Sequence, residues 1–407
     1  MALVVKKFGG SSVATPEKIK GVVARVLADK KPEDKVVVVV SAMGDTTDDL
    51  IALAKQLNDA PYGREMDMLM STGEQVSIAL LAMAFAAANQ PAVSMTGFQA
   101  GIKTGSDFGK GRIKSISPER IIAELDKGKI VVVAGFQGIT DDGDITTLGR
   151  GGSDTTAVSV AGAIKADVCE IYTDVEGIYS TDPRIVSDAR KMQEITYSEM
   201  LEMARLGALV MQPRSVEMGM HYGVPIHVRS TFSANNGTII RGEYTMEEKS
   251  FVIRGVASDS NIVKVAVIGV PDKPGVAGKI FSVLAKANID VDMIVQSVRD
   301  GETSVNDIVF TIAKPDLSQA KPILDSLIKD LGIENVLIGE NVAKVSAVGA
   351  GMLGHPGIAA DMFSALGEAG INIEIISTSE ISISCLVEGD KVKEAVRAIH
   401  AKFFPVD

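Results

Sequence analysis

Tryptophan is absent from the sequence, and aromatic residues make up only 4% of its 407 residues. The hydrophobic core must therefore consist mainly of aliphatic side chains and methionine, because 46% of the residues are hydrophobic. Cores of this kind are common in α/β proteins. At about 100–200 residues per domain, the length predicts two or three domains.

Cysteine is scarce as well. Cys169 and Cys385 are far apart and neither belongs to a CxxC pattern. Cys169 lies in an apolar stretch, so we expect it to be a buried free thiol. The first residues, MALVVKKFGG, are expected to form a strand with no signal peptide before it. Together these features favour a reducing, cytoplasmic setting.

The sequence also lacks an excess of positive charge and a long apolar run. Its 41 lysines and arginines stand against 52 acidic residues, a net charge of −11. This balance argues against nucleic acid or an anionic membrane as the main partner. No apolar run reaches the roughly 20 residues that cross a bilayer, and the alanine-rich residues 78–88 are too few. A small anionic substrate is still compatible, because local cations decide its binding.

The richest stretch is residues 146–184. The glycines of GRGG (149–152) permit positive φ and leave backbone amides uncovered, so this loop can surround an anion. Ser153 and Asp154 are expected to open a buried helix over residues 155–166, whose N-terminus suits phosphate or carboxylate. Asp154 would repel an anion, so we expect it to act on a metal-bound phosphate or a lysine. The alternative is a plain connection in which the glycines only make turns.

The N-terminal part predicts alternating strands and helices. Residues 35–41 contain five consecutive valines, which is typical of a strand buried on both faces of a parallel sheet. Thr15 and Pro16 are a strong helix start signal. No P-loop or dinucleotide-binding motif is present. The further strands are expected at 2–6, 92–95, 130–134, 168–172, 224–229 and 237–240, with helices from about residues 48 and 64 and a capping box at Thr196 and Glu199.

Four further predictions in this part concern particular side chains and one loop. Glu74 is expected where an alanine-rich helix begins, and an acid there usually offsets the helix dipole. Lys6 is expected to be a solvated lysine at a strand end. Residues 101–112 are rich in glycine and lysine and are predicted to be a mobile loop. Thr173 and Asp174 follow a strand, at the carboxyl edge where α/β sheets bind ligands.

An internal repeat follows a charged boundary at residues 242–252. PGVAGKIFSVL, from Pro274, aligns with PGIAADMFSAL, from Pro356. Each unit is predicted to run β, Pro-Gly loop, α, β, β, α, β, which is a ferredoxin-like pattern. Neither unit has a Cys/His cluster or an acid pair, so the repeat predicts ligand sensing rather than chemistry.

Three segments together resemble the aspartate kinase family: KFGGSSVA from Lys7, GRGGSD from Gly149 and YTDVEGIYSTDPR from Tyr172. The two repeated units resemble the paired ACT domains of that family, so the resemblance covers essentially the whole chain. It implies an α/β amino-acid-kinase fold, a mostly parallel sheet between helices, over residues 1–245. Two α+β ferredoxin-like ACT domains would follow at residues 260–335 and 340–407.

The resemblance also implies a reaction. The γ-phosphoryl of ATP would be transferred, with Mg²⁺, to the side-chain carboxylate of L-aspartate, giving 4-phospho-L-aspartate. This is the first step of the lysine, threonine and methionine branch. The attacking carboxylate is ionised at neutral pH, so no protein base is needed, and positioning and charge neutralisation must carry the catalysis.

The resemblance assigns roles to individual residues. Lys7 would reach the phosphoryl group and Asp154 would orient Lys7. Arg150 would hold a carboxylate in a two-pronged contact and Glu74 the ammonium. The remaining aspartate-binding residues would be Ser41, Thr47, Leu125, Asp126, Gly151, Gly152 and Ser153; ATP would be bound by Lys7, Phe8, Gly9, Gly10, Thr173, Asp174, Tyr179 and Arg184. No set of metal ligands is expected from the protein.

Lysine, threonine or both are the expected allosteric effectors, bound in the repeated units. The residues expected to line their sites are Asp272, Pro274, Gly275, Val276, Ala277, Asp290, Val291, Asp292, Gln296, Ile358, Ala359, Asn372, Ile373, Ser379 and Glu380. For Gln296, Asn372 and Ser379, ordinary polarity at a strand edge is an equal alternative. The ACT domains are expected to pair between chains, giving a homo-oligomer. Met246 lies where some relatives start a separate regulatory subunit.

One departure from the family pattern leaves other hypotheses open. Leu209 stands where relatives often have a lysine that contacts the nucleotide, which puts nucleotide affinity in question. A kinase of the same fold with another acceptor (acetylglutamate, glutamate or UMP) is disfavoured by the ACT repeat. A catalytically silent amino-acid-binding regulator is supported only by Leu209. It is disfavoured by the presence of Lys7, Glu74, Arg150 and Asp154.

Overall fold

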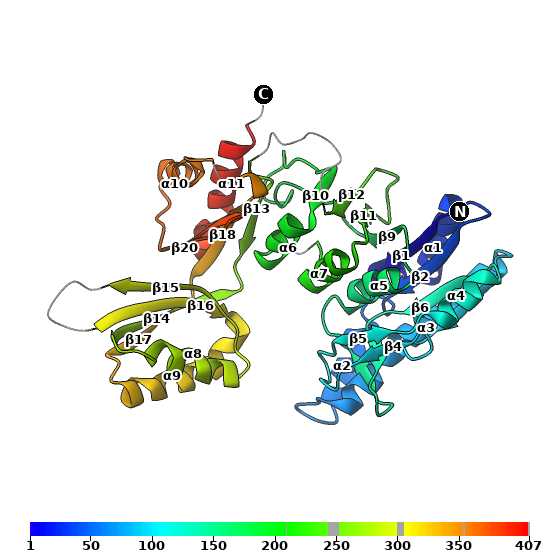
Figure 1. The fold of residues 1–407 in the computed structure, drawn as a ribbon, viewed down its shortest axis with the longest axis horizontal. Helices are drawn as coiled ribbons and strands as arrows, with labels where there is room; N and C mark the ends of the chain where they lie inside the picture. Colours follow the sequence, from blue (N-terminus) through cyan, green and yellow to red (C-terminus); the bar gives the residue numbers. More distant parts are fainter. Residues whose placement is uncertain (209, 243–251, 299–304, 353–354, 406–407) are drawn as a thin grey trace. The chain divides into compact units, whose positions relative to one another are not determined.

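The computed structural model describes residues 1–208, 210–242, 252–298, 305–352 and 355–405. The chain divides into two compact units (Figure 1). The first comprises Met1–Ile178, Lys191–Ala204 and Leu209–Glu247, and the second Tyr179–Arg190, Arg205–Ala208 and Glu248–Asp407.

An eight-stranded sheet forms the centre of the first unit, in the order β10-β12-β11-β9-β1-β2-β6-β3. All neighbouring strands are parallel except β11 and β12. The prediction of a mostly parallel sheet is therefore confirmed. Its strands are β1 (Leu3–Phe8), β2 (Lys35–Val40), β3 (Ala92–Met95), β6 (Ile130–Ala134), β9 (Val168–Thr173), β10 (Glu194–Thr196), β11 (Ile226–Ser230) and β12 (Thr238–Arg241).

The valine-rich strand β2 is buried on both faces, as its sequence predicts. Alternate residues Val36, Val38 and Val40 join a core cluster with side chains of α1 and α3, such as Ile19 and Leu81. The intervening valines are also fully buried, on the face that α5 covers. The helices of this unit are α1 (Pro16–Asp29), α2 (Thr46–Lys55), α3 (Arg64–Ala87), α4 (Glu119–Asp126), α5 (Gly152–Ala163), α6 (Tyr197–Arg205) and α7 (Pro213–Tyr222), and the 3-10 turn is η1 (Gly10–Ser12).

Local capping signals predicted two helix starts correctly. The hydroxyl of Thr15 accepts a hydrogen bond from the amide of Lys18, and Pro16 is the first residue of α1. The amide of Thr196 donates to Glu199, whose own amide donates to the Thr196 hydroxyl, which completes the capping box before α6. By contrast, α5 covers Gly152–Ala163 and not residues 155–166, because the glycine loop enters the helix directly and Lys165 adopts a φ of 56°.

The prediction of a mobile loop at residues 101–112 was wrong for its first part. Residues Ile102–Thr104 form strand β4, in which Ile102 and Thr104 are fully buried. This strand belongs to a second, four-stranded sheet with the order β5-β4-β7-β8. Its short apolar alternation is hidden in the sequence by the surrounding glycines and lysines. The other strands are β5 (Ile113–Ile116), β7 (Gln137–Ile139) and β8 (Ile145–Thr147).

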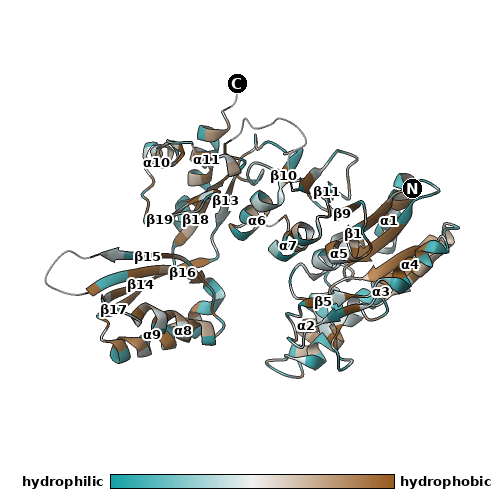
Figure 2. Cartoon of the chain, viewed as in Figure 1, coloured by the Kyte–Doolittle hydropathy of each residue, from teal (hydrophilic) through white to brown (hydrophobic). Residues whose placement is uncertain are grey.

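One helix in the described part of the chain, α3, is long and apolar enough to pass a test for membrane spans by length and composition. It packs on β3 and β6 as a cover of the central sheet. Its buried residues include Asp67 and Glu74, both hydrogen-bonded within the unit. These contacts are those of a core helix. In Figure 2 the helices carry both brown and teal, as expected for helices that cover a sheet with one face.

The second unit contains two four-stranded sheets, in the orders β15-β16-β14-β17 and β13-β18-β20-β19. The first repeat follows the predicted β-α-β-β-α-β order. The second does not, because its last described element is a helix and the upstream strand β13 takes the place beside β18. The elements are β13 (Gly255–Asp259), β14 (Ile262–Pro271), α8 (Val276–Lys286), β15 (Val291–Val298), β16 (Val305–Ala313), η2 (Lys314–Asp316), α9 (Leu317–Leu331), β17 (Asn335–Gly339), β18 (Val342–Val348), η3 (Ala350–Met352), α10 (Ile358–Glu368), β19 (Ile375–Thr378), β20 (Ser382–Glu388), η4 (Gly389–Lys391) and α11 (Val392–Phe403).

The predicted sequence boundaries of the three domains, 1–245, 260–335 and 340–407, stay a prediction. The sheets extend past two of them, since β17 reaches Gly339 and β13 begins at Gly255. Residues 179–190 also belong to the second unit. There Val186 joins the core of the second sheet, and the Ser180 hydroxyl lies 2.9 Å from Nε2 of the buried His400.

Candidate active site

A cavity of about 1070 Å³ opens in the first unit, where the loops after β1 and β2 meet α3 and the start of α5. Eleven of the residues predicted for catalysis, aspartate binding or ATP binding line it. They are Lys7, Gly9, Gly10, Ser41, Thr47, Glu74, Arg150, Gly151, Gly152, Ser153 and Asp154. Segments about 140 residues apart in the sequence are thus brought to one place, as expected for the carboxyl edge of a parallel sheet.

Lys7 and Asp154 form an ion pair in this cavity, with Nζ of Lys7 2.5 Å from Oδ1 of Asp154. The pair follows from the strand period, because Lys7 points to the face of the sheet that α5 covers. Asp154 lies in the first turn of α5, where the helix dipole favours a negative charge. The structure therefore puts a fixed ammonium group beside the glycine loop. The catalytic role of the pair stays a proposal.

Glu74 does not begin a helix, contrary to the prediction. It lies within α3, is 2% exposed, and its Oε1 accepts a hydrogen bond from the amide of Ala42. Gly73, the residue before it, also lies within α3 and lets this helix approach the loop after β2. A Cβ on Gly73 would lie 2.8 Å from that of Ala42. The sequence gives no local sign of this tertiary contact.

The carboxylate of Glu74 is only half satisfied. Its Oε2 atom is buried and has no hydrogen-bond partner among the described residues. Burial raises the pKa of Glu74 to about 7, although hydrogen bonds from backbone amides lower it. A buried, unpaired carboxylate oxygen facing a cavity is suited to bind a cationic group such as an ammonium.

Two glycines shape the walls of the cavity. Gly151 has a φ of 66°, and a side chain there would collide with Gln212. Gly10 has ordinary backbone angles, but a Cβ on it would lie 2.8 Å from the carbonyl oxygen of Ala42. Glycine is therefore required at 151 by conformation and contact, and at 10 by the close approach of two loops.

Several residues that line the cavity were missed by the sequence analysis. Arg214 of α7 donates to the carbonyl oxygens of Leu148 and Gly111. Burial, and then the charge of Arg112, lower the pKa of Arg214. The loop 105–112 was recognised as rich in glycine and lysine, but nothing local placed it at the site. The further lining residues are Ala42, Gly44, Asp48, Ile51, Met70, Gly109, Lys110, Arg112, Phe136, Thr147, Leu148 and Gly149.

Leu125 and Asp126 do not reach the cavity. Asp126 pairs with Lys35, the first residue of β2, at a distance of 2.6 Å. Leu125 is buried at the end of α4. A helix that precedes a parallel strand ends at the amino edge of the sheet, opposite the edge where the cavity lies. Their assignment to the aspartate site, which rested on the family resemblance alone, is not supported.

Comparison with known proteins identifies the family. Residues 2–230 match the amino acid kinase family, and residues 264–331 and 345–403 each match the ACT domain. The aspartokinase of Mycolicibacterium smegmatis is 50% identical over 407 residues, which cover 99% of this chain and 96% of that protein.

The chain belongs to the aspartokinase family.

Solved structures agree with this family. Aspartokinase III of E. coli in complex with aspartate and ADP, in its R-state, has a TM-score of 0.82 and 26% identity, covering 99% of this chain and 100% of that chain. The same E. coli protein in complex with lysine and aspartate, in its T-state, has a TM-score of 0.75 and 26% identity, covering 99% of both chains. This aspartokinase is therefore a kinase with an amino-acid-kinase domain and two ACT domains, as predicted.

Fewer of the residues predicted for ATP than of those predicted for aspartate line the cavity. Phe8 points away from the cavity and stacks on Tyr172 with ring centroids 4.5 Å apart. Thr173 donates to Asp174 at the end of β9, beside β1. Tyr179 and Arg184 belong to the second unit, where the exposed guanidinium of Arg184 pairs with Asp182 at 2.8 Å. Leu209 lies outside the described residues.

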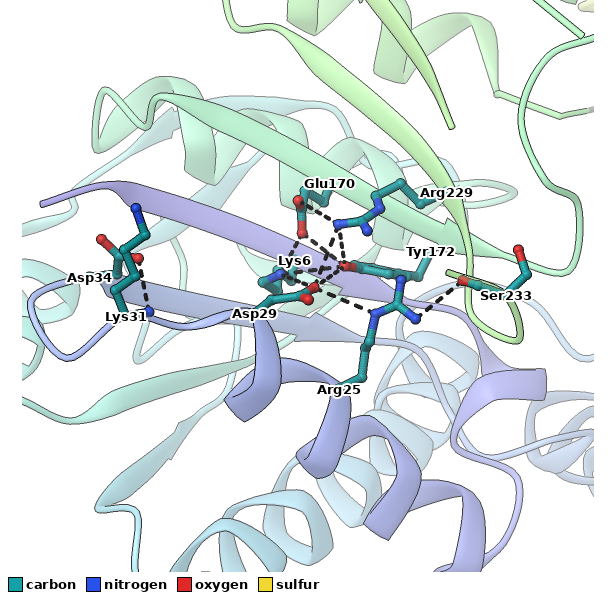
Figure 3. A network of polar contacts seen from close by, with 9 residues as sticks. All are labelled: Lys6, Arg25, Asp29, Lys31, Asp34, Glu170, Tyr172, Arg229 and Ser233. Carbon is teal, nitrogen blue, oxygen red and sulfur yellow. Dashed lines mark hydrogen bonds and ion pairs between the residues drawn. The ribbon is translucent and has the colours of Figure 1, made fainter. Parts of the chain in front are cut away.

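Lys6 is not a solvated lysine of this aspartokinase, contrary to the prediction. It is 3% exposed, and its Nζ lies 2.6 Å from Glu170 and 3.2 Å from Asp29. Figure 3 shows these groups converging with Tyr172 and Arg229. Burial raises the pKa of Glu170, but Lys6 and Arg229 outweigh it and hold the value below its usual range. The period of the strand directs Lys6 into the face covered by α1.

The predicted effector residues of this aspartokinase fall into separate groups. Residues 272–277 lie between the end of β14 and the start of α8, whereas residues 290–292 lie by the start of β15. These groups are at opposite ends of the first sheet, since β14 and β15 run parallel on either side of β16. Asp292 pairs with Lys344 of β18 at 2.6 Å, a contact between the two sheets.

The effector residues predicted for the second repeat are also described. Ile358 and Ala359 begin α10, Asn372 and Ile373 precede β19, and Ser379 and Glu380 follow it. The side chain of Ile373 packs against the core of the second sheet, and the Ser379 hydroxyl lies 2.8 Å from that of Ser382. No group of three or more His, Cys, Asp and Glu side chains that could hold a metal occurs in the described ranges.

Proposed function

We propose that the cavity binds L-aspartate and the γ-phosphoryl of ATP, and that the product is 4-phospho-L-aspartate. The observation that carries the proposal is the meeting of the Lys7–Asp154 ion pair with Glu74 and Arg150 in one cavity. The E. coli structural neighbour bound to aspartate and ADP supports both ligands.

The acceptor is recognised by groups of opposite charge. The unpartnered Oε2 of Glu74 receives the ammonium of aspartate, which satisfies a buried oxygen. Arg150 lines the cavity and forms no ion pair in the described part of the chain, so its guanidinium is available for a bidentate carboxylate contact. Ser41, Thr47 and Ser153 add hydroxyl groups, and Gly151 and Gly152 add amides. This arrangement favours a small amino acid with two carboxylates.

The reaction requires two anions to meet. A side-chain carboxylate oxygen of aspartate forms a bond to the γ-phosphorus, and the bond to the bridging oxygen breaks, so that ADP leaves. Lys7 neutralises charge on the transferring group while the amides of Gly9 and Gly10 donate to it. Asp154 fixes the ammonium of Lys7 at 2.5 Å. No protein base takes part.

Mg²⁺ suits this site through one carboxylate. Mg²⁺ in kinases is usually held by one or two carboxylates together with substrate phosphates, and Asp154 is the carboxylate that adjoins Lys7 in the cavity. When bound, the ion would neutralise phosphate charge. We further propose that Thr173, Asp174, Tyr179 and Arg184 contribute to ATP binding. Phe8, which stacks on Tyr172, would hold the loop at Gly9 and Gly10 in place without touching the nucleotide.

Regulation by lysine, threonine or both at the ACT domains is the remaining part of the proposal. The E. coli neighbour bound to lysine and aspartate in a T-state supports an amino-acid effector. The separation of residues 272–277 from 290–292 supports an effector site completed by a second copy, and so a homo-oligomer. Met246, where a separate regulatory subunit could start, lies outside the described residues. The two buried free cysteines fit a reducing cytoplasm.

The test is acyl-phosphate trapping with hydroxylamine in the presence of ATP, Mg²⁺ and L-aspartate. Hydroxamate that depends on aspartate is expected, and lysine plus threonine should reduce its formation. Trapping without inhibition would remove the effector assignment and leave the kinase assignment intact. Trapping only with acetylglutamate or glutamate, ATP consumption that depends on UMP without any trapping, or no trapping at all, would overturn the proposed acceptor.

A further inference from the structure

The cavity has an excess of positive charge that the assigned residues do not use. Besides Lys7 and Arg150, it is lined by Lys110, Arg112 and Arg214. The acidic side chains that line it are Asp48, Glu74 and Asp154. Lys110 and Arg112 are exposed and form no ion pair in the ranges that the structure describes. Two exposed cations therefore line the cavity without an ion-pair partner among the described residues, although the whole chain carries −11.

The loop 105–112 holds these two cations, and Asp67 holds the loop. Asp67 lies in the first turn of α3 and is 1% exposed. Its Oδ2 accepts hydrogen bonds from the amides of Gly109 (2.9 Å) and Thr147 (2.8 Å), and its Oδ1 accepts from the Thr147 hydroxyl at 2.8 Å. One buried carboxylate thus joins the cation-bearing loop to β8, the strand that leads to Arg150.

Further bonds fix the same loop from its other side. The amide of Gly111 donates to the carbonyl oxygen of Thr147 at 2.8 Å. Arg214 donates to the carbonyl oxygen of Gly111 at 2.9 Å. Lys110 and Arg112 thus flank a glycine that is bonded to two different elements. The position of their backbone is set before any ligand binds, which reduces the ordering cost of a contact.

The loop lies on the acceptor side of the cavity. A Cβ on Gly149 would lie 3.0 Å from the carbonyl oxygen of Gly109, so the loop touches the segment that carries Arg150. Asp67 and Glu74 are seven residues apart on α3, so they share one face of the helix. The proposed ATP residues Thr173 and Asp174 follow β9, on the other side of β1 from β2.

We propose that Lys110 and Arg112 form a second anion clamp, which binds a carboxylate of the acceptor aspartate opposite Arg150, and that Asp67 is the positioning residue of this clamp. The proposal rests on the assignment of the cavity to aspartate. Such a clamp would favour a dicarboxylic amino acid, since each carboxylate then has a cationic partner. It also offsets the repulsion between the acceptor and the incoming γ-phosphoryl.

Single substitutions at the clamp test this directly by steady-state kinetics of the full chain with aspartate and ATP varied in turn. Arg112→Met and Lys110→Met are each expected to raise the KM for aspartate about tenfold or more, the usual effect of losing a hydrogen bond to a charged group. The KM for ATP should change less than twofold. Lys114→Met is the matched control, because Lys114 lies on β5, is exposed and pairs with Asp141 outside the cavity.

Asp67 is tested by two variants that separate its hydrogen bonds from its charge. In Asp67→Asn, the amide oxygen can accept both backbone bonds and the NH₂ group can donate to the Thr147 hydroxyl, which can rotate. This variant should stay within about threefold of the native KM for aspartate. Asp67→Ala loses all three bonds and should raise that KM about tenfold or more, with the KM for ATP nearly unchanged.

Each other outcome overturns a defined part of the proposal. If only the KM for ATP rises, the two cations bind phosphate and not the acceptor. If Arg112→Met leaves the KM values for aspartate and ATP unchanged, the proposed clamp does not exist. Equal damage from Asp67→Asn and Asp67→Ala would show that the charge of Asp67 acts, not its hydrogen bonds. If Asp67→Ala does not fold, Arg112→Met and Lys110→Met still test whether the clamp binds aspartate. Absence of aspartate-dependent trapping in the native protein would instead refute the assigned acceptor.

Discussion

Lys6 and Lys7 are neighbours on β1, yet their ammonium groups lie on opposite faces of the sheet. Nζ of Lys6 lies 2.6 Å from Glu170 in a buried network, and Nζ of Lys7 lies 2.5 Å from Asp154 in the cavity. The strand period of two separates them. The same residue type therefore has a structural position and a proposed catalytic position on adjacent residues.

Lys7→Met should lower kcat for phosphoryl transfer about 100-fold or more, because it removes the cation proposed to neutralise the transferring group. Hydroxamate formation at saturating aspartate and ATP measures the effect. The melting temperature should stay close to that of the native protein, since the Lys7 side chain is at the cavity and is not part of the core. A variant that keeps most of its kcat would contradict the assigned mechanism.

Lys6→Met should have the reverse pattern. Removing one member of a buried ion-pair network leaves Glu170 without its main partner and should cost about 3–5 kcal/mol of unfolding free energy. Denaturant unfolding of the full chain measures it. The folded fraction should retain its kcat. A stable Lys6→Met protein with lost activity would show that Lys6, not only Lys7, takes part in the reaction.

Glu74 should make aspartate binding depend on pH. Burial raises its pKa to about 7 in the free protein, and the ammonium of aspartate requires the ionised form. The value of kcat/KM for aspartate should therefore fall as the pH drops below about 7. Glu74→Gln should remove this dependence and raise the KM for aspartate about tenfold or more. A native pH profile that is flat from pH 6 to 8 would argue against Glu74 as the ammonium ligand.

The same pKa has a consequence for stability, with a defined sign. A carboxyl group whose pKa is raised in the folded state favours folding at low pH, and this contribution is lost as the pH rises from the ordinary value of 4.5 towards about 7. Glu74→Gln cannot ionise. The variant should therefore gain stability relative to the native protein as the pH rises from 5 to 8, which melting curves at several pH values would detect.

Gly151→Ala should impair the acceptor site more than a comparable glycine substitution elsewhere. Gly151 has a φ of 66° and its Cβ would collide with Gln212, so the backbone that carries Arg150 must shift. The expected result is a fall of about tenfold or more in kcat/KM for aspartate. Gly143→Ala is the matched control, since Gly143 has a φ of 89° but nothing within 4 Å of a Cβ. Equal effects at both positions would mean that backbone strain alone matters.

Asp292→Asn should change the proposed inhibition by lysine or threonine. The ion pair of Asp292 with Lys344 joins the two ACT sheets. Partial desolvation raises the pKa of Asp292, but Lys344 outweighs it and holds that pKa below its usual range. Loss of the charge should alter the effector concentration for half-inhibition severalfold. This concentration is obtained by measuring, for each variant, the ratio of inhibited to uninhibited rate over a range of effector concentrations. An unchanged inhibition curve would remove this contact from the regulatory pathway.

The sequence predicted those features that local signals determine. The valine run of β2, the caps of α1 and α6 and the glycine loop before α5 each depend on a few adjacent residues. The position of Glu74 could not be predicted in this way, because the glycine before it serves a contact with Ala42, about 30 residues away in the sequence. The place of the loop 105–112 at the cavity was missed for the same reason, since it is held by Asp67 and Arg214, which are distant in the sequence. Leu125 and Asp126 were misplaced because only the family resemblance supported them.

Strand β13 lies upstream of the first repeat but pairs with β18 in the second ACT sheet. This pairing limits where the chain can be truncated without damage to that sheet. A fragment that starts after β13 would leave the edge of β18 uncovered, with unpaired backbone groups open to pairing with other chains. Residues 340–407 alone are therefore expected to aggregate. Met246 precedes β13, so a shorter product started there would retain every strand of both ACT sheets.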